Sequence, residues 1–346
     1  MNRCDANKGG HRGRWPRAGH NGGAADGARD RGPYSGVVTD TQEQHAETAA
    51  TAPAAPRPGP AALWILAVAA VLSLAGVVYS LYRLTGMADG LDDTGVMILA
   101  NSLFSPIIVT VFAGAVAGVV TPRLVKGPQQ ALTVLGALVL GLAAGAAAYF
   151  SFSADADIAL AVGLVLFGSA IAGGLFALPK RSVAVVAGLS ATLLLLAFMF
   201  GRGFYEAASS VSLFSDPLDE YGALGTAIPF VAGIACGIGA FLYLRAKKAG
   251  VKLLGHLLAG ALPGGIWLAA TVIAQVGVEV VLNTGLNEVS PLDEAFLALS
   301  FQWQYNGSMT AMFAGALCAV LAYGLLLPKP AKAGAAKPQS KAAKKS

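Results

Sequence analysis

The feature that most constrains this chain is a series of eight long apolar runs between residues 61 and 327. Each run holds about 20 or more residues, most of them Ala, Gly, Val, Leu or Phe. A helix rises about 1.5 Å per residue, so about 20 residues cross the ~30 Å hydrocarbon layer of a bilayer. Backbone groups in lipid need internal partners and these runs do not alternate, so helices fit them and barrel strands do not. We therefore predict an all-α, polytopic membrane bundle with transmembrane helices at 61–82, 95–120, 130–150, 158–178, 183–201, 222–244, 253–282 and 307–327.

Composition supports this prediction and argues against several other classes of protein. Only 12% of the residues are charged, against about 25% in soluble domains. The formal net charge of +5 lies in short loops and tails, which does not favour a nucleic-acid partner. The three Cys have no CxxC spacing, and three of the four His lie in the first 45 residues, so we expect no metal site and no cofactor. Phosphate-loop, HExxH and GxSxG motifs are absent, which favours a non-enzymatic protein over a membrane enzyme acting on lipid-linked substrates.

Two polar tails flank the predicted membrane domain, which covers residues 61–328. Residues 1–60 are rich in Gly, Ala, Arg and Pro without apolar periodicity, and we expect them to be disordered. Residues 329–346 are Lys-rich, and each base near a membrane surface adds about 1 kcal/mol of attraction to anionic lipid headgroups. A separate hypothesis is that translation begins at Val38, because VTDTQEQHAE resembles a protein start. The intact mass of the native protein tests it, and a mass that includes residues 1–37 contradicts it.

The charges of the loops predict the orientation. Alternate loops and the last tail carry bases and no acid, and the remaining loops carry the acids. Bases near membrane spans stay on the cytoplasmic side. We therefore expect a protein of the plasma membrane with both termini in the cytoplasm. The bases of the three loops are Arg123, Lys126, Lys180, Arg181, Arg245, Lys247, Lys248 and Lys252.

A Phe followed by closely spaced small residues recurs in every second predicted helix. The segments are FAGAVAG from Phe112, FGSAIAG from Phe167, FVAGIACG from Phe230 and FAGALCA from Phe313. We interpret them as four copies of one hairpin in the same orientation; the alternative is a likeness of composition alone. Small residues four apart predict tight helix packing within the bundle, or a face between copies of the chain.

Few polar groups fall inside the predicted spans, and polar groups at membrane depth are candidates for function. Together these polar groups predict a polar pathway. Pro106 should kink the helix that contains it, which supports this prediction. The alternative for Glu279 is a carboxylate at the outer interface that reaches water. The residues of the predicted pathway are Asn101, Ser105, Gln275, Glu279 and Gln302.

The outer side carries two bases, Arg83 and Arg202, each followed by loop acids. They would form an outer anion site or, alternatively, ordinary ion pairs between helix end and loop. The outer segment LDEAFLALSFQWQ, from Leu292, has the apolar spacing of a short amphipathic helix lying on the membrane surface.

Two functions remain open. Repeated hairpins and interrupted helices favour a transporter or channel-like protein for a small solute or ion. Scarce buried charge and small-residue faces favour a non-catalytic subunit or scaffold of a membrane complex, with protein partners or further copies of the chain. A water-accessible cavity reaching Asn101, Gln275 and Glu279 would favour transport; a solid interior with an exposed small-residue groove would favour a subunit.

Overall fold

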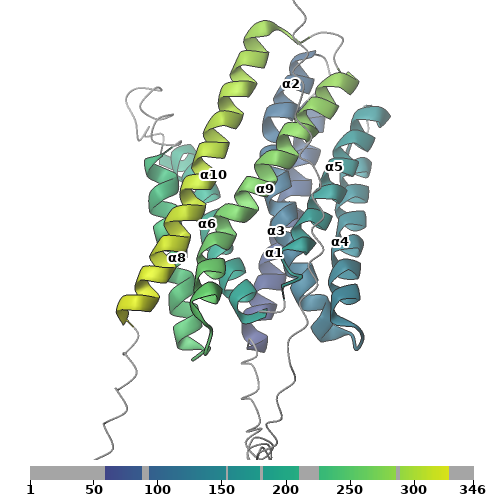
Figure 1. Ribbon diagram of the computed structural model, residues 1–346. Helices are drawn as coiled ribbons and strands as arrows, with labels where there is room; N and C mark the ends of the chain where they lie inside the picture. The colour runs from purple at the N-terminus through teal and green to yellow at the C-terminus, as the bar shows by residue number, and fades with distance from the viewer. Residues whose placement is uncertain are drawn as a thin grey trace, which may run out of the picture. The chain divides into compact units, whose positions relative to one another are not determined.

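The computed structural model describes residues 59–87, 93–152, 155–179, 182–209, 226–285 and 289–326, and the regular structure in these ranges is helical throughout. Eight helical segments are long and apolar enough to cross a membrane, so the prediction of an all-α, multi-pass membrane protein is confirmed. The two predicted tails lie outside the described residues, apart from Gly59 and Pro60. The helices are α1 (Pro60–Met87), α2 (Asp93–Ser102), α3 (Phe104–Leu124), α4 (Gln129–Ser151), α5 (Ala156–Leu175), α6 (Ser182–Ser209), α8 (Ala227–Ala246), α9 (Leu253–Gly285) and α10 (Pro291–Leu326) (Figure 1).

The second membrane span, Gly95–Leu124, is divided into α2 and α3 at Leu103, whose φ of −62° and ψ of −28° remain helical. Leu103 forms a turn between them, in which its amide donates to the carbonyl of Ala100 at 3.3 Å. Pro106 has no amide hydrogen, so the carbonyl of Ser102, four residues earlier, loses its helical partner. The irregularity that we predicted at Pro106 therefore occurs three residues before the proline.

The two last helices are longer than a bilayer requires. At about 1.5 Å per residue, the 33 residues of α9 and the 36 of α10 are roughly 50 and 54 Å long. α9 continues without interruption through the buried Pro263. The segment from Leu292, expected as a separate surface helix, is instead the first part of α10. Ser290 caps this helix, since its Oγ accepts a hydrogen bond from the Asp293 amide at 3.2 Å. After Pro291 at the first helical position, neither Gly nor Pro occurs before Gly307.

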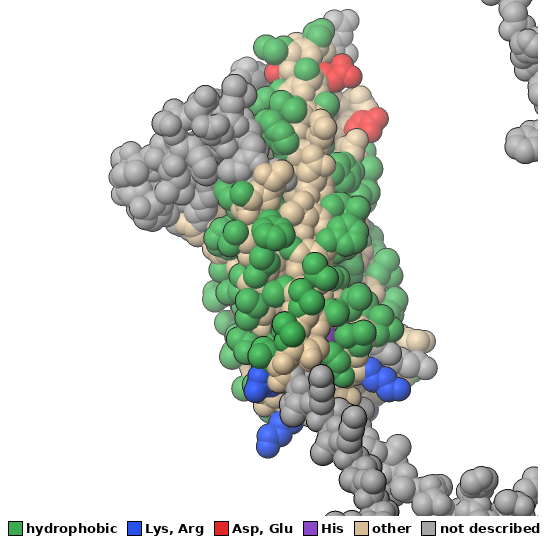
Figure 2. Space-filling view, turned by 60° about the vertical axis from the view of Figure 1, so that its left-hand side comes forward, with side chains coloured by type: hydrophobic (Ala, Val, Ile, Leu, Met, Phe, Trp, Pro, Cys, Tyr) green, Lys and Arg blue, Asp and Glu red, His purple; other side chains and the backbone are tan. Residues whose placement is uncertain are grey.

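Charges lie at the two ends of the bundle, with an apolar belt between them (Figure 2). Arg123, Lys126 and the bases between α8 and α9 are at one end, which we name the basic end. Asp155, Asp157, Asp293 and Glu294 begin helices at the other, the acidic end. Large apolar side chains such as Leu142, Leu164, Leu242 and Leu317 are exposed along the belt, as expected of a surface in contact with lipid.

The same helix pairs contact each other in the two halves of the bundle. In the first half, α3 contacts α1, α4 and α5, and α4 contacts α1 and α5. In the second half, α8 contacts α6, α9 and α10, and α9 contacts α6 and α10. The two sets agree when α1, α3, α4 and α5 are matched in order with α6, α8, α9 and α10. α9 also contacts α2, α3 and α5 and so joins the halves.

Small residues make these contacts close. A Cβ built on Gly114 of α3 would collide with the backbone of Ala170 in α5, and one built on Gly233 of α8 would lie 2.6 Å from the carbonyl oxygen of Ala311 in α10. The small-residue segments of the sequence therefore pack in pairs, α3 with α5 and α8 with α10. Their Phe residues differ in setting, since Phe112 is buried whereas Phe313 is 62% exposed. Repetition of a single hairpin stays a prediction.

Candidate functional site

Three residues of the predicted polar pathway, Asn101, Glu279 and Gln302, lie at one depth near the acidic end of the bundle. Asn101 precedes Arg123 by 22 residues, and Glu279 follows His256 by 23, which places each about 33–35 Å along its helix from the basic end. Gln302 is 24 residues, or about 36 Å, from the end of α10 at Leu326. These distances match or exceed the ~30 Å hydrocarbon layer. The three side chains thus lie near the interface at the acidic end and do not line the middle of the membrane.

The individual contacts of these residues are local. Asn101 is exposed, and its Nδ2 donates to the carbonyl of Met97 in its own helix at 3.1 Å. Gln275 is exposed and accepts a hydrogen bond from the hydroxyl of Tyr305 at 2.8 Å, which links α9 to α10. Glu279 and Gln302 are exposed. The structure therefore brings Gln275 to α10, whereas Asn101 bonds only within its own helix.

Ser105 lies elsewhere, in a groove between α1, α3 and α6. This outer groove has a volume of about 690 Å³ and is lined mostly by apolar groups, including Val109 and Phe200. Of its serine hydroxyls, that of Ser80 donates to the carbonyl of Gly76 at 2.9 Å, within its own helix. Gln275, Glu279 and Gln302 are not part of its lining.

The predicted outer anion site is only partly described. The Arg83 side chain is exposed near the end of α1, whereas the Arg202 side chain lies outside the described residues. Their helices contact each other, and Leu81 and Phe200 line the same outer groove. The contact between α1 and α6 is consistent with a shared outer site.

The buried hydroxyls of the core bond to carbonyls of their own helices. Thr110 donates to Pro106 at 2.7 Å, Ser169 to Val165 at 2.7 Å and Thr192 to Gly188 at 2.9 Å. Thr271 and Ser308 do the same in α9 and α10. A hydroxyl that donates in this way has used its only hydrogen and offers a solute no donor, so these bonds tie each side chain to its own helix and do not connect neighbouring helices.

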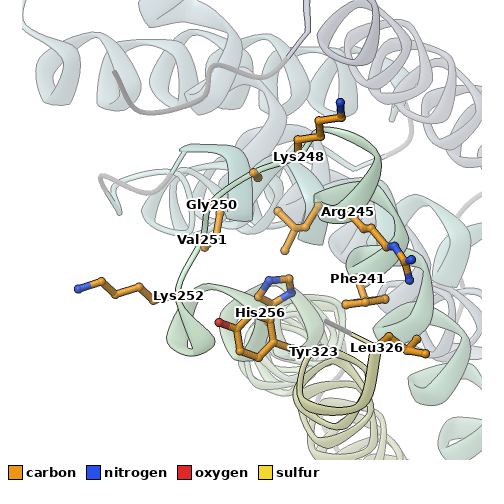
Figure 3. A pocket seen from close by; sticks show the side chains of 11 residues that line it. Phe241, Arg245, Lys248, Gly250, Val251, Lys252, His256, Tyr323 and Leu326 are labelled. Atoms are coloured by element: carbon orange, nitrogen blue, oxygen red, sulfur yellow. The ribbon is translucent and has the colours of Figure 1, made fainter. Parts of the chain in front are cut away.

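A cavity lined by several basic side chains lies at the basic end, between the ends of α8, α9 and α10 (Figure 3). We name it the basic cavity. Its volume is about 470 Å³, and its lining contains no carboxylate. Arg245 ends α8, Lys248 and Lys252 belong to the α8–α9 loop, and His256 and Tyr323 come from α9 and α10.

His256 is held in the middle of this cavity. It is 3% exposed, and its ring centroid lies 4.6 Å from that of Tyr323 and 5.8 Å from that of Phe241. Its Nδ1 is buried without a hydrogen-bond partner. An unpaired buried polar atom costs about 1–3 kcal/mol, so the cavity has an unmet hydrogen-bonding capacity.

The backbone around the cavity explains the position of its cations. Lys248 has φ = 46°, a left-handed conformation common at helix ends, and it turns the chain back from α8 toward α9. The last carbonyls of α8 are satisfied by this turn, since the amides of Lys247 and Lys248 donate to Tyr243 and Arg245 at 3.1 and 2.9 Å. In Figure 3 the Lys248 and Lys252 side chains extend outward, on two sides of His256.

The cavity is closed toward the middle of the membrane. One helical turn beyond His256, a Cβ on Gly260 would collide with the carbonyl of Gly315 in α10. A Cβ on Gly237 of α8 would lie 2.5 Å from the same carbonyl oxygen. The three backbones therefore meet directly below the cavity and close it on that side.

Sequence reasoning missed this cavity because it interpreted Arg245, Lys248 and Lys252 only as signals of orientation. His256 is the one His in an apolar run, and its place four residues after Lys252 was a usable signal. The contribution of Tyr323 depends on the packing of α10 against α9, which the sequence does not specify. Among the described residues, no group of three His, Cys, Asp or Glu side chains is arranged to hold a metal ion.

Searches against protein-family models, curated proteins and solved structures return no match for this chain.

Proposed function

We propose that this multi-pass membrane protein acts as a non-catalytic subunit or scaffold of a membrane protein complex. The observation that carries the proposal is the direct backbone contact between helices at mid-membrane depth in both halves. Gly114 is 9 residues from Arg123, or about 14 Å from the basic end, and Gly315 is 11 residues, or about 16 Å, from Leu326. Contacts of this kind support a solid interior, as does the bonding of buried hydroxyls within their own helices.

A groove on the surface of the first half would receive the partner. It lies between α1, α3 and α4, has a volume of about 380 Å³ and is lined by small side chains that include Ala67, Ala113, Ala117 and Ala143. In lipid, small residues allow the backbones of two helices to approach closely and gain van der Waals contact. A transmembrane helix of another chain is the occupant that this lining fits.

Co-purification tests this proposal. The full chain, tagged and extracted in mild detergent, is compared with Ala143→Phe, which fills the groove, and with Ala146→Phe, which places the same ring on an exposed site of α4 outside the lining. We expect one partner protein to co-purify at a fixed ratio to the wild-type chain and to Ala146→Phe, and to be missing from the Ala143→Phe preparation. Recovery of the chain alone in all three preparations contradicts the proposal. A second copy as the partner identifies a homo-oligomer.

The second candidate is a transporter or channel-like protein for a small solute or ion, and Pro106 in the second span favours it. Pro106 leaves the carbonyl of Ser102 without a helical partner and lines the outer groove, which Ser102 and Ser105 also line. Gly and Pro positions in membrane helices often mark substrate sites, because they free backbone carbonyls for a ligand.

Flux measurements in proteoliposomes test this candidate. Purified full chain is assayed for Na⁺, K⁺, H⁺, Cl⁻ and phosphate movement beside protein-free liposomes. Flux that falls in Pro106→Ala and persists in Glu279→Gln supports a role for Pro106 in transport. Rates equal to those of protein-free liposomes for every ion contradict transport of these solutes.

A further inference from the structure

We propose that the basic cavity binds the phosphate group of an anionic ligand at the membrane interface. The inference is independent of the proposed function, since it concerns a different face and a different ligand. It begins from the charge of the lining, in which Arg245, Lys248 and Lys252 surround one opening without a carboxylate. None of the described acids lies at the basic end, so these cations have no protein counter-ion among the described residues.

The buried His256 is the second observation that indicates a ligand. Its ring lines the cavity, and its Nδ1 is fully buried and unpaired. Tyr323 and Phe241 fix the ring, so a small adjustment of a pre-formed site would pair it. Phosphate oxygens suit this set of groups because they accept from guanidinium, ammonium, imidazole and phenol donors at once.

The position of the cavity also suits a phosphate. α9 begins at Leu253, beside the cavity, and a helix N-terminus favours negative charge. The C-termini of α8 and α10 oppose this effect, although carbonyls in the last turn of α8 already accept from the amides of Lys247 and Lys248. The cavity lies where the apolar belt ends, at the depth of lipid headgroups, and Phe241 and Leu326 give it an apolar side.

Two sources supply such a group: an anionic phospholipid from the membrane and a phosphate from solution. The experiment measures thermal unfolding of the purified full chain in neutral detergent, because a ligand that binds only the folded state raises the unfolding midpoint. Three additions are titrated: phosphatidylglycerol, zwitterionic phosphatidylcholine, and sodium phosphate beside sodium chloride of equal ionic strength. A rise with phosphatidylglycerol alone assigns the lipid, and a rise with sodium phosphate above chloride assigns the soluble anion.

Matched variants separate the cavity from general surface charge. Arg245→Gln with Lys252→Gln removes two cations from the lining, whereas Lys126→Gln with Lys247→Gln removes two exposed cations of the same end that do not line it. We expect the concentration for half of the midpoint shift to rise by about tenfold or more in the first pair. The second pair should stay within about threefold of the wild type.

A third variant tests whether weaker binding results from misfolding and not from the lost charge. Lys248→Asn removes a lining cation but keeps a residue that tolerates the left-handed backbone at this position. We expect it to unfold at the wild-type temperature without ligand and to bind several-fold more weakly. Two results would overturn the proposal. One is equal binding by the wild type and all the lining variants. The other is that neither phosphatidylglycerol nor phosphate shifts the unfolding midpoint of the wild type.

Discussion

Gly114 of α3 lies directly against the backbone of Ala170 in α5, so that a methyl group on Gly114 would overlap the Ala170 carbonyl. Ala170 also approaches α4, where a Cβ on Gly141 would lie 3.2 Å from the Ala170 Cβ. In the second half, Gly315 of α10 has the position that Ala170 of α5 has in the first, since it meets Gly260 of α9 and Gly237 of α8. Each half therefore has one small residue at which three helices converge.

Replacement of Gly114 should destabilise the first half of the bundle. In Gly114→Ala the new methyl group meets a backbone carbonyl, which cannot turn away as a flexible side chain can, so α3 and α5 must separate. Overpacking of this kind costs about 1–3 kcal/mol. The free energy of unfolding in mixed detergent micelles measures the cost. Gly168→Ala, in α5 with nothing within 4 Å of the added Cβ, is the control, and an equal loss in both variants contradicts the explanation.

Gly315→Ala should be at least as costly, because its Cβ would meet two helices. It would collide with the carbonyl of Gly260 and lie 3.1 Å from that of Gly233. Gly324→Ala, two turns later in α10 with no neighbour within 4 Å, should leave the unfolding midpoint unchanged or raise it slightly. If both variants unfold alike, α10 does not depend on this close approach.

The eight spans were predictable because hydrophobic length alone separates lipid-spanning helices from loops. The start of α10 was not, since the first turns of this helix have the apolar spacing of an amphipathic surface helix, whereas its end at Leu326 lies one residue from the predicted 327. The capping Ser290 with Pro291 behind it was the local signal of its true start. Pro263 shows the converse, because a buried proline is tolerated where neighbouring helices keep the chain helical.

For the candidate sites, too, some features were predictable from the sequence and others were not. The depth of Asn101 and Glu279 follows from counting residues along each helix, so their interfacial position was predictable from the sequence. The basic cavity was not, because it forms where three helix ends meet and one of its walls, Tyr323, is separated from His256 by 67 residues. Periodicity and charge locate residues along a helix, whereas packing decides which helices are neighbours.

The cap at Ser290 should control the order of the first turns of α10. Its Oγ accepts from the Asp293 amide at 3.2 Å and donates to the Asp293 carboxylate at 2.7 Å. Loss of an N-cap costs about 0.5–2 kcal/mol. In Ser290→Ala we expect faster amide hydrogen exchange over residues 291–300, with unchanged exchange in α9. Ser300→Ala, in the body of the same helix, is the control; unchanged exchange in Ser290→Ala would show that the cap does not limit opening.

The hydrogen bond between Tyr305 and Gln275 should add modestly to the contact of α10 with α9. It is 2.8 Å long, and side-chain hydrogen bonds between membrane helices contribute about 0.6 kcal/mol on average. A double-mutant cycle with Tyr305→Phe and Gln275→Leu measures the coupling, which we expect at about 0.5–1.5 kcal/mol. Glu279→Gln, one turn away and exposed, is the control and should change stability by less than about 0.5 kcal/mol. Coupling indistinguishable from zero contradicts a role for the bond.

The basic end should face the cytoplasm, and labelling of single cysteines tests this orientation. In a background with Cys4, Cys236 and Cys318 changed to Ala, one Cys is placed at exposed sites of either end. Lys126→Cys and Lys252→Cys lie at the basic end, and Asp157→Cys and Glu294→Cys at the acidic end. Because bases near membrane spans stay inside, a membrane-impermeant maleimide added to intact cells should label only the acidic-end pair. Permeabilised cells, in which all four sites react, provide the control for accessibility. Labelling of only the basic-end pair in intact cells would invert the orientation and place the basic cavity on the outer face.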